Sequence, residues 1–238
     1  MILGILDADI LRDDLKGQYI SYAYMVQVLF EHAMETSVIN NEIKYKHYRV
    51  IDGEYPKKID ECDAYLVTGS KSSAYDDDEW VGQLKVYVQS LFQKDKKILG
   101  ICFGHQLIAM ALGGDTRLAS HGWGVGVHQY QTTMSGRKLF LPEQLSLLVS
   151  HRDQVVALPK EASLLAFSEF CPNAAYQIKD QVLCFQGHPE FTPQYANALM
   201  QVRKEIIPPE TFELAQKSLQ STTHSAQVAK VMAAFIQP

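Results

Sequence analysis

The segment KILGICFGHQ, residues 97–106, holds most of what this sequence reveals. Its apolar first half, residues 97–101, predicts a buried strand, and a helix is expected over residues 105–112, where Gly113-Gly114 ends it. The pattern Gly100-x-Cys102-x-Gly104 spans the junction. A strand, a tight turn and a helix in this order are typical of a nucleophile elbow, here with sulfur in place of oxygen.

Cys102 has the surroundings that a reactive thiol needs. Its neighbouring glycines lack Cβ atoms, so backbone segments can pass close to a strained turn. A helix beginning just after Cys102 favours the thiolate, and the amide N–H of Phe103 is expected to form part of an oxyanion hole. A lone cysteine is more often a small buried hydrophobic residue, and this remains our interpretation of Cys62, Cys171 and Cys184.

A cysteine nucleophile requires a base, and the base requires a group that orients it. The segment Gln186-Gly187-His188-Pro189-Glu190 offers both at the end of an expected strand. Because Pro189 keeps His188 out of the helical region, the segment is extended, and residues two apart project to the same side. Glu190 is therefore expected to reach the ring of His188, fix its tautomer and favour the imidazolium that pairs with a thiolate.

Short β-rich segments alternate with helical patterns around these motifs, which predicts an α/β fold: an open, mostly parallel sheet with helices on both faces. Beyond residue 120 no long helix separates the strand candidates, so a partly antiparallel extension is expected, followed by a helical tail. We expect a single domain, 1–238, with a catalytic core at 1–205 and the tail at 206–238. The expected strands lie at 2–6, 45–51, 64–67, 97–101, 125–133, 145–150, 163–168, 174–178 and 182–186; helical patterns lie at 22–33, 80–91 and 105–112, from 192, and twice after 208.

Charge and composition argue against several classes of function. The chain of 238 residues has a net charge of −5 and no basic run longer than a pair, so no nucleic-acid partner is expected. No apolar run reaches the roughly 18 residues of a membrane span, and the N-terminus lacks the basic region of a signal peptide. The four cysteines form no CxxC pair, so we expect no metal, no cofactor and a reduced, cytoplasmic protein.

Four motifs occur in a consistent order along the chain: Val67-Thr-Gly-Ser70, Gly100-Ile-Cys-Phe-Gly-His-Gln106, Ser150-His-Arg-Asp-Gln-Val155 and Gly187-His-Pro-Glu190. Together they resemble the class I, or triad, glutamine amidotransferases, in particular the stand-alone branch similar to the glutaminase portion of GMP synthetase. The resemblance covers about residues 40–200. It implies a flavodoxin-like fold and a catalytic triad.

The roles implied by this resemblance are specific. In the triad Cys102, His188 and Glu190, Cys102 would attack the carboxamide of L-glutamine, giving a γ-glutamyl thioester and ammonia, and water would then release glutamate. A second oxyanion N–H would come from Gly69-Ser70, where the family's usual Gly-Gly-Pro is replaced by Gly-Ser-Lys. Contacts to the substrate are implied for Gln106, His151 and Asp153.

Three functions stay open, the first two acting on a small molecule. The leading one is glutamine hydrolysis, with ammonia used by a synthetase partner on another polypeptide, since no synthetase domain follows here. Segments 48–56 and 69–80 resemble those of γ-glutamyl peptidases, which cleave a γ-glutamyl amide in a larger molecule. The third is a non-catalytic binding or regulatory subunit of a synthetase, whose loop at Gly69 no longer forms an oxyanion hole.

Two further patterns have ordinary structural interpretations. Gly122-Trp-Gly-Val-Gly126 precedes an expected strand and lacks the helix N-terminus of a phosphate-binding loop, so we interpret it as a turn that brings Trp123 near the pocket mouth. The acidic run at residues 76–79 is expected to cap the next helix rather than to bind a cation.

Overall fold

A computed structural model describes residues 1–35 and 42–237 of the chain. The strands are β1 (Ile2–Asp7), β2 (Lys44–Arg49), β3 (Ala64–Val67), β4 (Lys97–Ile101), β5 (Asp115–Leu118), β6 (Gly124–Thr132), β7 (Gln144–His151), β8 (Asp153–Ala157), β9 (Ala162–Phe167), β10 (Ala175–Ile178) and β11 (Val182–Phe185). The helices are α1 (Asp13–Tyr19), α2 (Tyr22–Glu35), α3 (Glu79–Gln93), α4 (Phe103–Ala111), α5 (Met134–Lys138), α6 (Pro193–Val202), α7 (Pro209–Ser218) and α8 (Ser225–Ile236). Two short 3₁₀ helices, Val50–Asp52 and Ile59–Glu61, lie between β2 and β3.

The central sheet has the strand order β2-β1-β3-β4-β11-β10-β9-β6-β7. The strands from β2 to β11 in this order run parallel, and every pairing beyond β11 is antiparallel. A separate two-stranded sheet pairs β5 with β8. This arrangement confirms the predicted α/β class, the parallel part of the sheet and its antiparallel extension.

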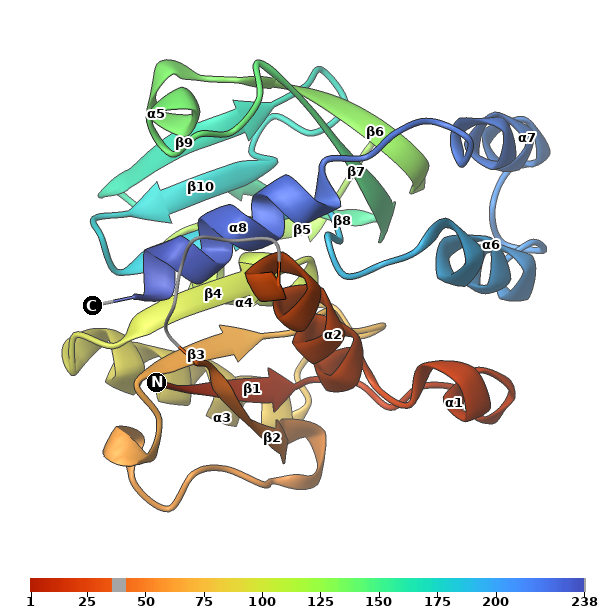
Figure 1. The fold of residues 1–238 in the computed structure, drawn as a ribbon. Coiled ribbons are helices and arrows are strands. Elements are labelled where there is room, and N and C mark those ends of the chain that lie inside the picture. Colours follow the sequence, from red (N-terminus) through yellow and green to blue (C-terminus); the bar gives the residue numbers. More distant parts are fainter. Residues whose placement is uncertain (36–41, 238) are drawn as a thin grey trace.

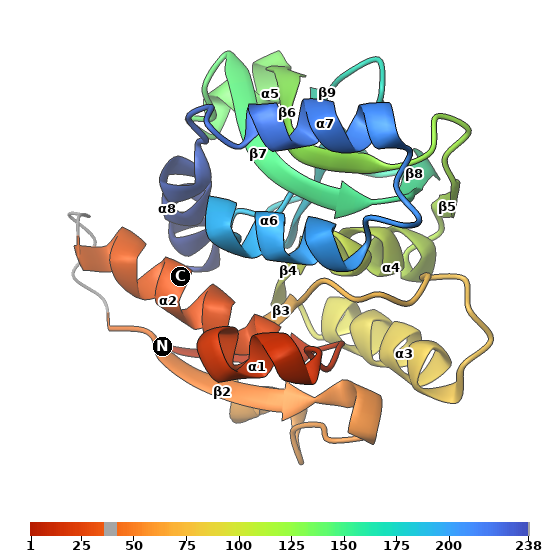
Figure 2. The ribbon, with the colours of Figure 1, turned by 90° about the vertical axis from the view of Figure 1, so that its right-hand side faces the viewer.

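Helices cover both faces of β1, β3, β4 and β11 because these parallel strands are largely buried and apolar on both sides, whereas the edge strand β2 is mostly polar. In β1, Leu3 and Ile5 pack against α2 and α8, whereas Leu6 faces the cluster that α3 and α4 form on the other side. The strand β3 divides in the same way, with Leu66 on the first face and Val67 on the second. Figures 1 and 2 show the resulting three layers, with the sheet between the two helix pairs.

The C-terminal segment returns to the sheet. Val228, Met232 and Ile236 of α8 belong to the same buried cluster as Leu3 and Leu99 of the central strands. The helix α7 lies against β6 instead, above α6 (Figure 2). We propose that the tail folds as part of one domain with the rest of the chain, because removing α8 would uncover the core.

Several elements differ from the sequence-based prediction. The helix α4 begins at Phe103, two residues earlier than expected, and α1, α5, β5 and β8 were not predicted. The expected turn at 122–126 is wrong in its second half, where Gly124 and Gly126 are already part of β6. The reason is pairing with β7, in which Gly124 lies opposite His151 and Gly126 lies opposite Val149, as the expected strand from residue 125 already implied.

The acidic run lies at the start of α3 as predicted, with Asp78 at the N-cap position and Glu79 in the first turn, but it supplies no side-chain cap. Asp78 occupies the residue before the helix, and its side chain accepts no hydrogen bond from the helix N–H groups. Asp76 instead accepts a hydrogen bond from the backbone N–H of Ser73, 2.8 Å away. Among the described helices, none combines the length and the hydropathy needed to cross a membrane.

Candidate active site

Three adjacent parallel strands end at one edge of the sheet. β3 pairs with β4 so that Val67 lies opposite Gly100, and β11 pairs with β4 on its other side so that Phe185 lies opposite Ile101. The loops that follow these strands therefore meet at the carboxyl ends of the strands, where open α/β sheets bind their ligands. The loop after β3 carries Gly69-Ser70, the loop after β4 is Cys102 alone, and the loop after β11 carries His188 and Glu190.

Cys102 forms a sharp turn between β4 and α4. Its φ is +51°, a left-handed conformation that residues with a Cβ rarely adopt, and its N–H donates to the Phe185 carbonyl at 2.9 Å. The flanking glycines are needed for space: a Cβ at Gly100 would lie 2.7 Å from Ile108, and one at Gly104 would overlap the Val67 carbonyl. The predicted order of strand, sharp turn and helix is confirmed, and so is the close packing at the two glycines.

The start of α4 supplies a free donor beside the sulfur. Phe103 is the first residue of the helix, so its N–H has no carbonyl within the helix to bond. The next N–H, that of Gly104, is already used, since it donates to the Thr68 carbonyl at 3.1 Å. The Phe103 N–H is thus available to a ligand, which an oxyanion donor would have to be.

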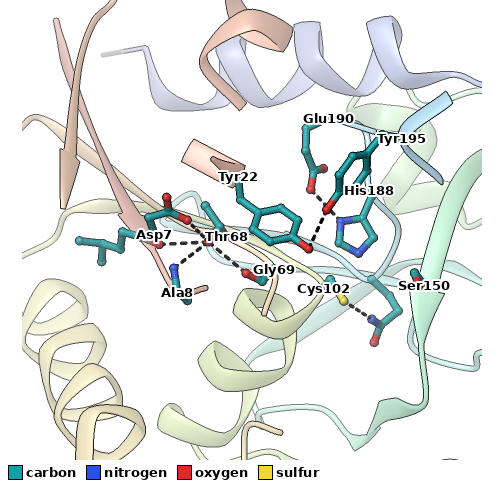
Figure 3. Close-up of polar contacts among 12 residues, drawn as sticks. Asp7, Ala8, Tyr22, Thr68, Gly69, Cys102, Ser150, His188, Glu190 and Tyr195 are labelled. Atoms are coloured by element: carbon teal, nitrogen blue, oxygen red, sulfur yellow. Dashed lines mark hydrogen bonds and ion pairs between the residues drawn. The ribbon is translucent and has the colours of Figure 1, made fainter. Parts of the chain in front are cut away.

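His188 and Glu190 form the buried pair predicted from the His-Pro-Glu segment. Nδ1 of His188 lies 2.7 Å from Oε1 of Glu190, and both side chains are at least 96% buried. The ring is stacked on Phe191 with 3.8 Å between the ring centroids and 12° between their planes. Figure 3 shows the ring between Glu190 and Cys102, and the ring and the Cys102 Cβ both lie within 4 Å of the Cβ position of Gly69.

The environment of His188 favours its cationic form. Burial by itself would lower the pKa of the imidazole, but the charges of Glu190 and of a Cys102 thiolate outweigh burial and raise this pKa to about 10. His188 therefore carries a proton at neutral pH when Cys102 is ionised. Gln186 adds a contact on the sulfur, since its Nε2 lies 3.6 Å from Sγ of Cys102.

The loop after β3 is fixed by polar contacts. The Thr68 hydroxyl donates to the Gly69 carbonyl at 3.2 Å and accepts from the Ala8 N–H at 2.9 Å (Figure 3). Asp9 accepts the backbone N–H of Lys71 at 2.8 Å, which holds the loop to the end of β1. Gly69 lies very close to the ring of His188, which is possible because glycine has no Cβ: an added Cβ would lie 2.9 Å from Cε1 of His188.

A small cavity of about 60 Å³ opens onto Cys102. It is lined by all three residues for which the sequence implied substrate contacts, and by Ser70 of the loop after β3. The Gln106 amide donates to the Asp153 carbonyl at 2.8 Å and to Gln186 at 3.0 Å, so this side chain also braces the floor of the cavity. Its other lining residues are Lys71, Ser72, Ser73, Trp123, Ser150, Arg152 and Arg203.

His151 and Asp153 are buried beside the cavity. Burial, together with the neighbouring His128, lowers the pKa of His151 to about 3, so this ring is neutral at physiological pH. The Asp153 carboxylate accepts hydrogen bonds from Ser73 at 2.5 Å and from Tyr75 at 3.0 Å. Asp153 thus holds the loop after β3 over the cavity, a contact that its sequence position did not reveal.

Sequence reasoning also missed Arg203, which follows α6 and lines the cavity about 100 residues from Cys102. No local pattern marks it, because its position depends on how α6 packs on β7. Trp123 does line the cavity, as predicted. Among the described residues, no group of three or more His, Cys, Asp or Glu side chains is placed to hold a metal ion, and the four cysteines are free and buried.

Comparison with known proteins identifies the family. The family model described as glutamine amidotransferase class-I matches residues 19–204, more than three quarters of the chain. The chain belongs to the class I glutamine amidotransferase family. Gamma-glutamyl peptidase 3 of Arabidopsis thaliana is 33% identical over 196 residues, which cover 78% of this chain and 77% of that protein.

Two further proteins show how much of the chain the resemblance spans. A glutamine amidotransferase-like protein of Schizosaccharomyces pombe is 31% identical over 98% of both chains. The crystal structure of a glutamine amidotransferase from Thermotoga maritima matches with a TM-score of 0.72 and 17% identity, covering 99% of this chain and 95% of that one. The structural match supports the fold, and the family model and the relatives support membership.

Proposed function

We propose that this class I glutamine amidotransferase hydrolyses a γ-glutamyl amide bond through a thioester on Cys102. One observation carries the proposal: a cysteine on a strained turn faces a buried imidazole whose far nitrogen lies 2.7 Å from a carboxylate. Nucleophile, base and orienting group are the parts that thiol-dependent acyl transfer needs. Three neighbouring loops bring them together with an oxyanion donor.

The first step forms the acyl-enzyme. The Cys102 thiolate attacks the γ-carbonyl carbon, and the electron pair of the C=O bond moves to oxygen, where the Phe103 N–H and an N–H of Gly69-Ser70 stabilise the negative charge. As the carbonyl re-forms, the C–N bond breaks, and the His188 imidazolium gives its proton to the leaving nitrogen. The products are a γ-glutamyl thioester and a free amine, or ammonia when the amide is that of glutamine.

The second step releases glutamate. Neutral His188 takes a proton from water, whose oxygen attacks the thioester carbon, and the C–S bond then breaks to return the thiolate. Glu190 keeps Nδ1 protonated throughout, so that the other nitrogen serves as base and then as acid. Because the mechanism requires a free thiolate, we also propose that the protein works in a reducing compartment such as the cytoplasm.

We propose γ-glutamyl peptides as the preferred substrates. The relative named gamma-glutamyl peptidase covers most of the chain, and the loop after β3, part of the segment 69–80 that resembles the peptidases, lines the cavity with residues 70–73. Free glutamine is the second candidate, supported by the description of the matching family. In that case a synthetase partner would use the ammonia.

The test measures the release of amines from γ-glutamyl dipeptides and of ammonia from glutamine, with glutamate as the common product. Cys102→Ala should abolish both activities. The control Cys184→Ala removes a buried thiol from the neighbouring strand but leaves Cys102 in place, so activity should remain. Turnover by Cys102→Ala would refute the thioester mechanism. A chain that hydrolyses neither substrate, alone or with added synthetase, would instead support the non-catalytic subunit.

A further inference from the structure

Two arginines meet at one aromatic ring beside the nucleophile. The Cζ atoms of Arg152 and Arg203 lie 5.1 and 5.3 Å from the centre of the Trp123 ring, within the range of a cation–π interaction. Nη1 of Arg203 also donates to Oγ of Ser150 at 2.6 Å. These four residues line the same cavity as Cys102, although they come from three separate parts of the chain.

The charges of this pair are not neutralised. Neither guanidinium forms an ion pair with a carboxylate of residues 1–35 or 42–237, whereas the other four arginines do: Arg12, Arg49, Arg117 and Arg137. The cavity's own carboxylate, Asp153, already accepts two hydroxyl hydrogen bonds. Two positive charges on one ring repel each other, and they stand in a chain whose net charge is −5.

This arrangement is suited to binding an anion. Arginine presents several N–H donors in a plane that matches a carboxylate, and a guanidinium already fixed by a ring and a hydroxyl loses little freedom when it binds. An arginine stacked on an aromatic residue is common on protein surfaces and needs no ligand. Two such arginines on a single ring, both without an ion-pair partner in the described part of the chain and both lining the cavity of a nucleophile, indicate a ligand site.

We propose that Arg152 and Arg203, held on Trp123, form a carboxylate-binding subsite that selects anionic substrates for Cys102. This inference rests on the proposed function for its choice of substrate class. The carboxylate has two sources in a γ-glutamyl peptide: the α-carboxylate of the glutamyl group, and the C-terminal carboxylate of the part that leaves. Both are the same chemical group, and the second experiment below distinguishes them.

The first experiment uses alkylation of Cys102 and needs no turnover. Iodoacetate is anionic and iodoacetamide is neutral, and the two add nearly the same group to the thiolate, so their rate ratio reports attraction of an anion to the cavity. Mass spectrometry of the Cys102 peptide gives both rates, with free cysteine as the reference thiol. The wild-type ratio should exceed that of free cysteine and fall as ionic strength rises.

The variants Arg152→Gln and Arg203→Gln should lower this ratio about tenfold while leaving the iodoacetamide rate unchanged. Arg203→Lys keeps the positive charge but loses the planar guanidinium, so it should lower the rate ratio less than Arg203→Gln does. Arg137→Gln, on α5 and outside the cavity lining, is the matched control and should leave it unchanged. A wild-type ratio equal to that of free cysteine, or an equal fall in both rates in the cavity variants, would overturn the proposal.

The second experiment compares a γ-glutamyl dipeptide with its C-terminal amide. If the subsite binds the leaving part, Arg203→Gln should raise KM about tenfold or more for the acid and not for the amide. If it binds the α-carboxylate, KM should rise equally for both. An unchanged KM for both would refute the subsite. Absence of all turnover would refute the proposed function instead, and the alkylation ratios would still decide the subsite.

Discussion

Replacing Gly69 by alanine should disable the site without unfolding the protein. The added Cβ would lie 2.9 Å from Cε1 of His188, whereas carbon atoms in contact are separated by about 3.5–4.0 Å, so the ring or the loop must retreat by roughly 0.6 Å or more. The ring is held by its 2.7 Å contact with Glu190 and by its stacking on Phe191. Since φ of Gly69 is not positive, alanine brings no backbone strain.

The size of the effect follows from this displacement. A misplacement of about 1 Å costs on the order of 100-fold in rate, so Gly69→Ala should lower kcat/KM for the better of glutamine and a γ-glutamyl dipeptide by about 10- to 100-fold. Iodoacetamide alkylation of Cys102 at pH 7 should slow as well, because the imidazolium no longer pairs properly with the thiolate. Circular dichroism and the thermal midpoint should change little.

The matched control is Gly82→Ala. Gly82 lies inside α3 with no atom within 4 Å of its Cβ position, so alanine there should gain roughly 1 kcal/mol of helix stability and leave the kinetics alone. If Gly69→Ala had the same kcat/KM and the same alkylation rate as the wild type, the view that this glycine sets the position of the His188 ring would be refuted. Equal losses in both variants would refute it too.

Three further changes test separate features. Glu190→Gln removes the charge that raises the pKa of His188, so burial should lower this pKa and slow Cys102 alkylation at pH 7 at least tenfold; an unchanged rate–pH profile would contradict the pairing. Burial raises the pKa of Asp7 from 3.8 to about 6, so wild-type stability relative to Asp7→Asn should fall by about 3 kcal/mol between pH 4 and 6, as urea unfolding at several pH values would show; a constant difference would exclude this ionisation. In Gly104→Ala the added Cβ would overlap the Val67 carbonyl, so the free energy of unfolding should fall by about 1–3 kcal/mol in the same assay. An unchanged free energy of unfolding would show that α4 can shift to make room at little cost.

The parallel part of the sheet was predictable because its strands and helices are strongly patterned. Strands such as β4 are apolar after their first residue, Lys97, and their helices carry broad apolar stripes, so the local sequence suffices. The elements that were missed carry weak signals. The helix α1 contains a glycine and one buried residue, Leu15, and β5 is four residues long with only Thr116 buried.

The site was predictable where neighbouring residues define it and hidden where distant residues complete it. The turn at Cys102 and the pair His188–Glu190 are each local, and parallel pairing of β4 with β11 brings them together. The contact of Asp153 with Ser73 joins residues 80 positions apart, and Arg203 reaches the cavity from the end of α6. Such contacts depend on packing that no short sequence pattern encodes.

The three strand ends contribute different parts of the site, and this affects how the substrate preference of such a protein can change. Backbone pairing between β4 and β11 sets the spacing of sulfur and imidazole, whereas the loop over the cavity comes from β3 on the opposite flank. Mutations in the outer part of that loop, at residues 71–73, alter which molecules are admitted, whereas the loop's first residue, Gly69, is constrained by its contact with His188. If the proposed mechanism holds, selectivity is free to drift during descent while the bond-breaking apparatus is inherited intact.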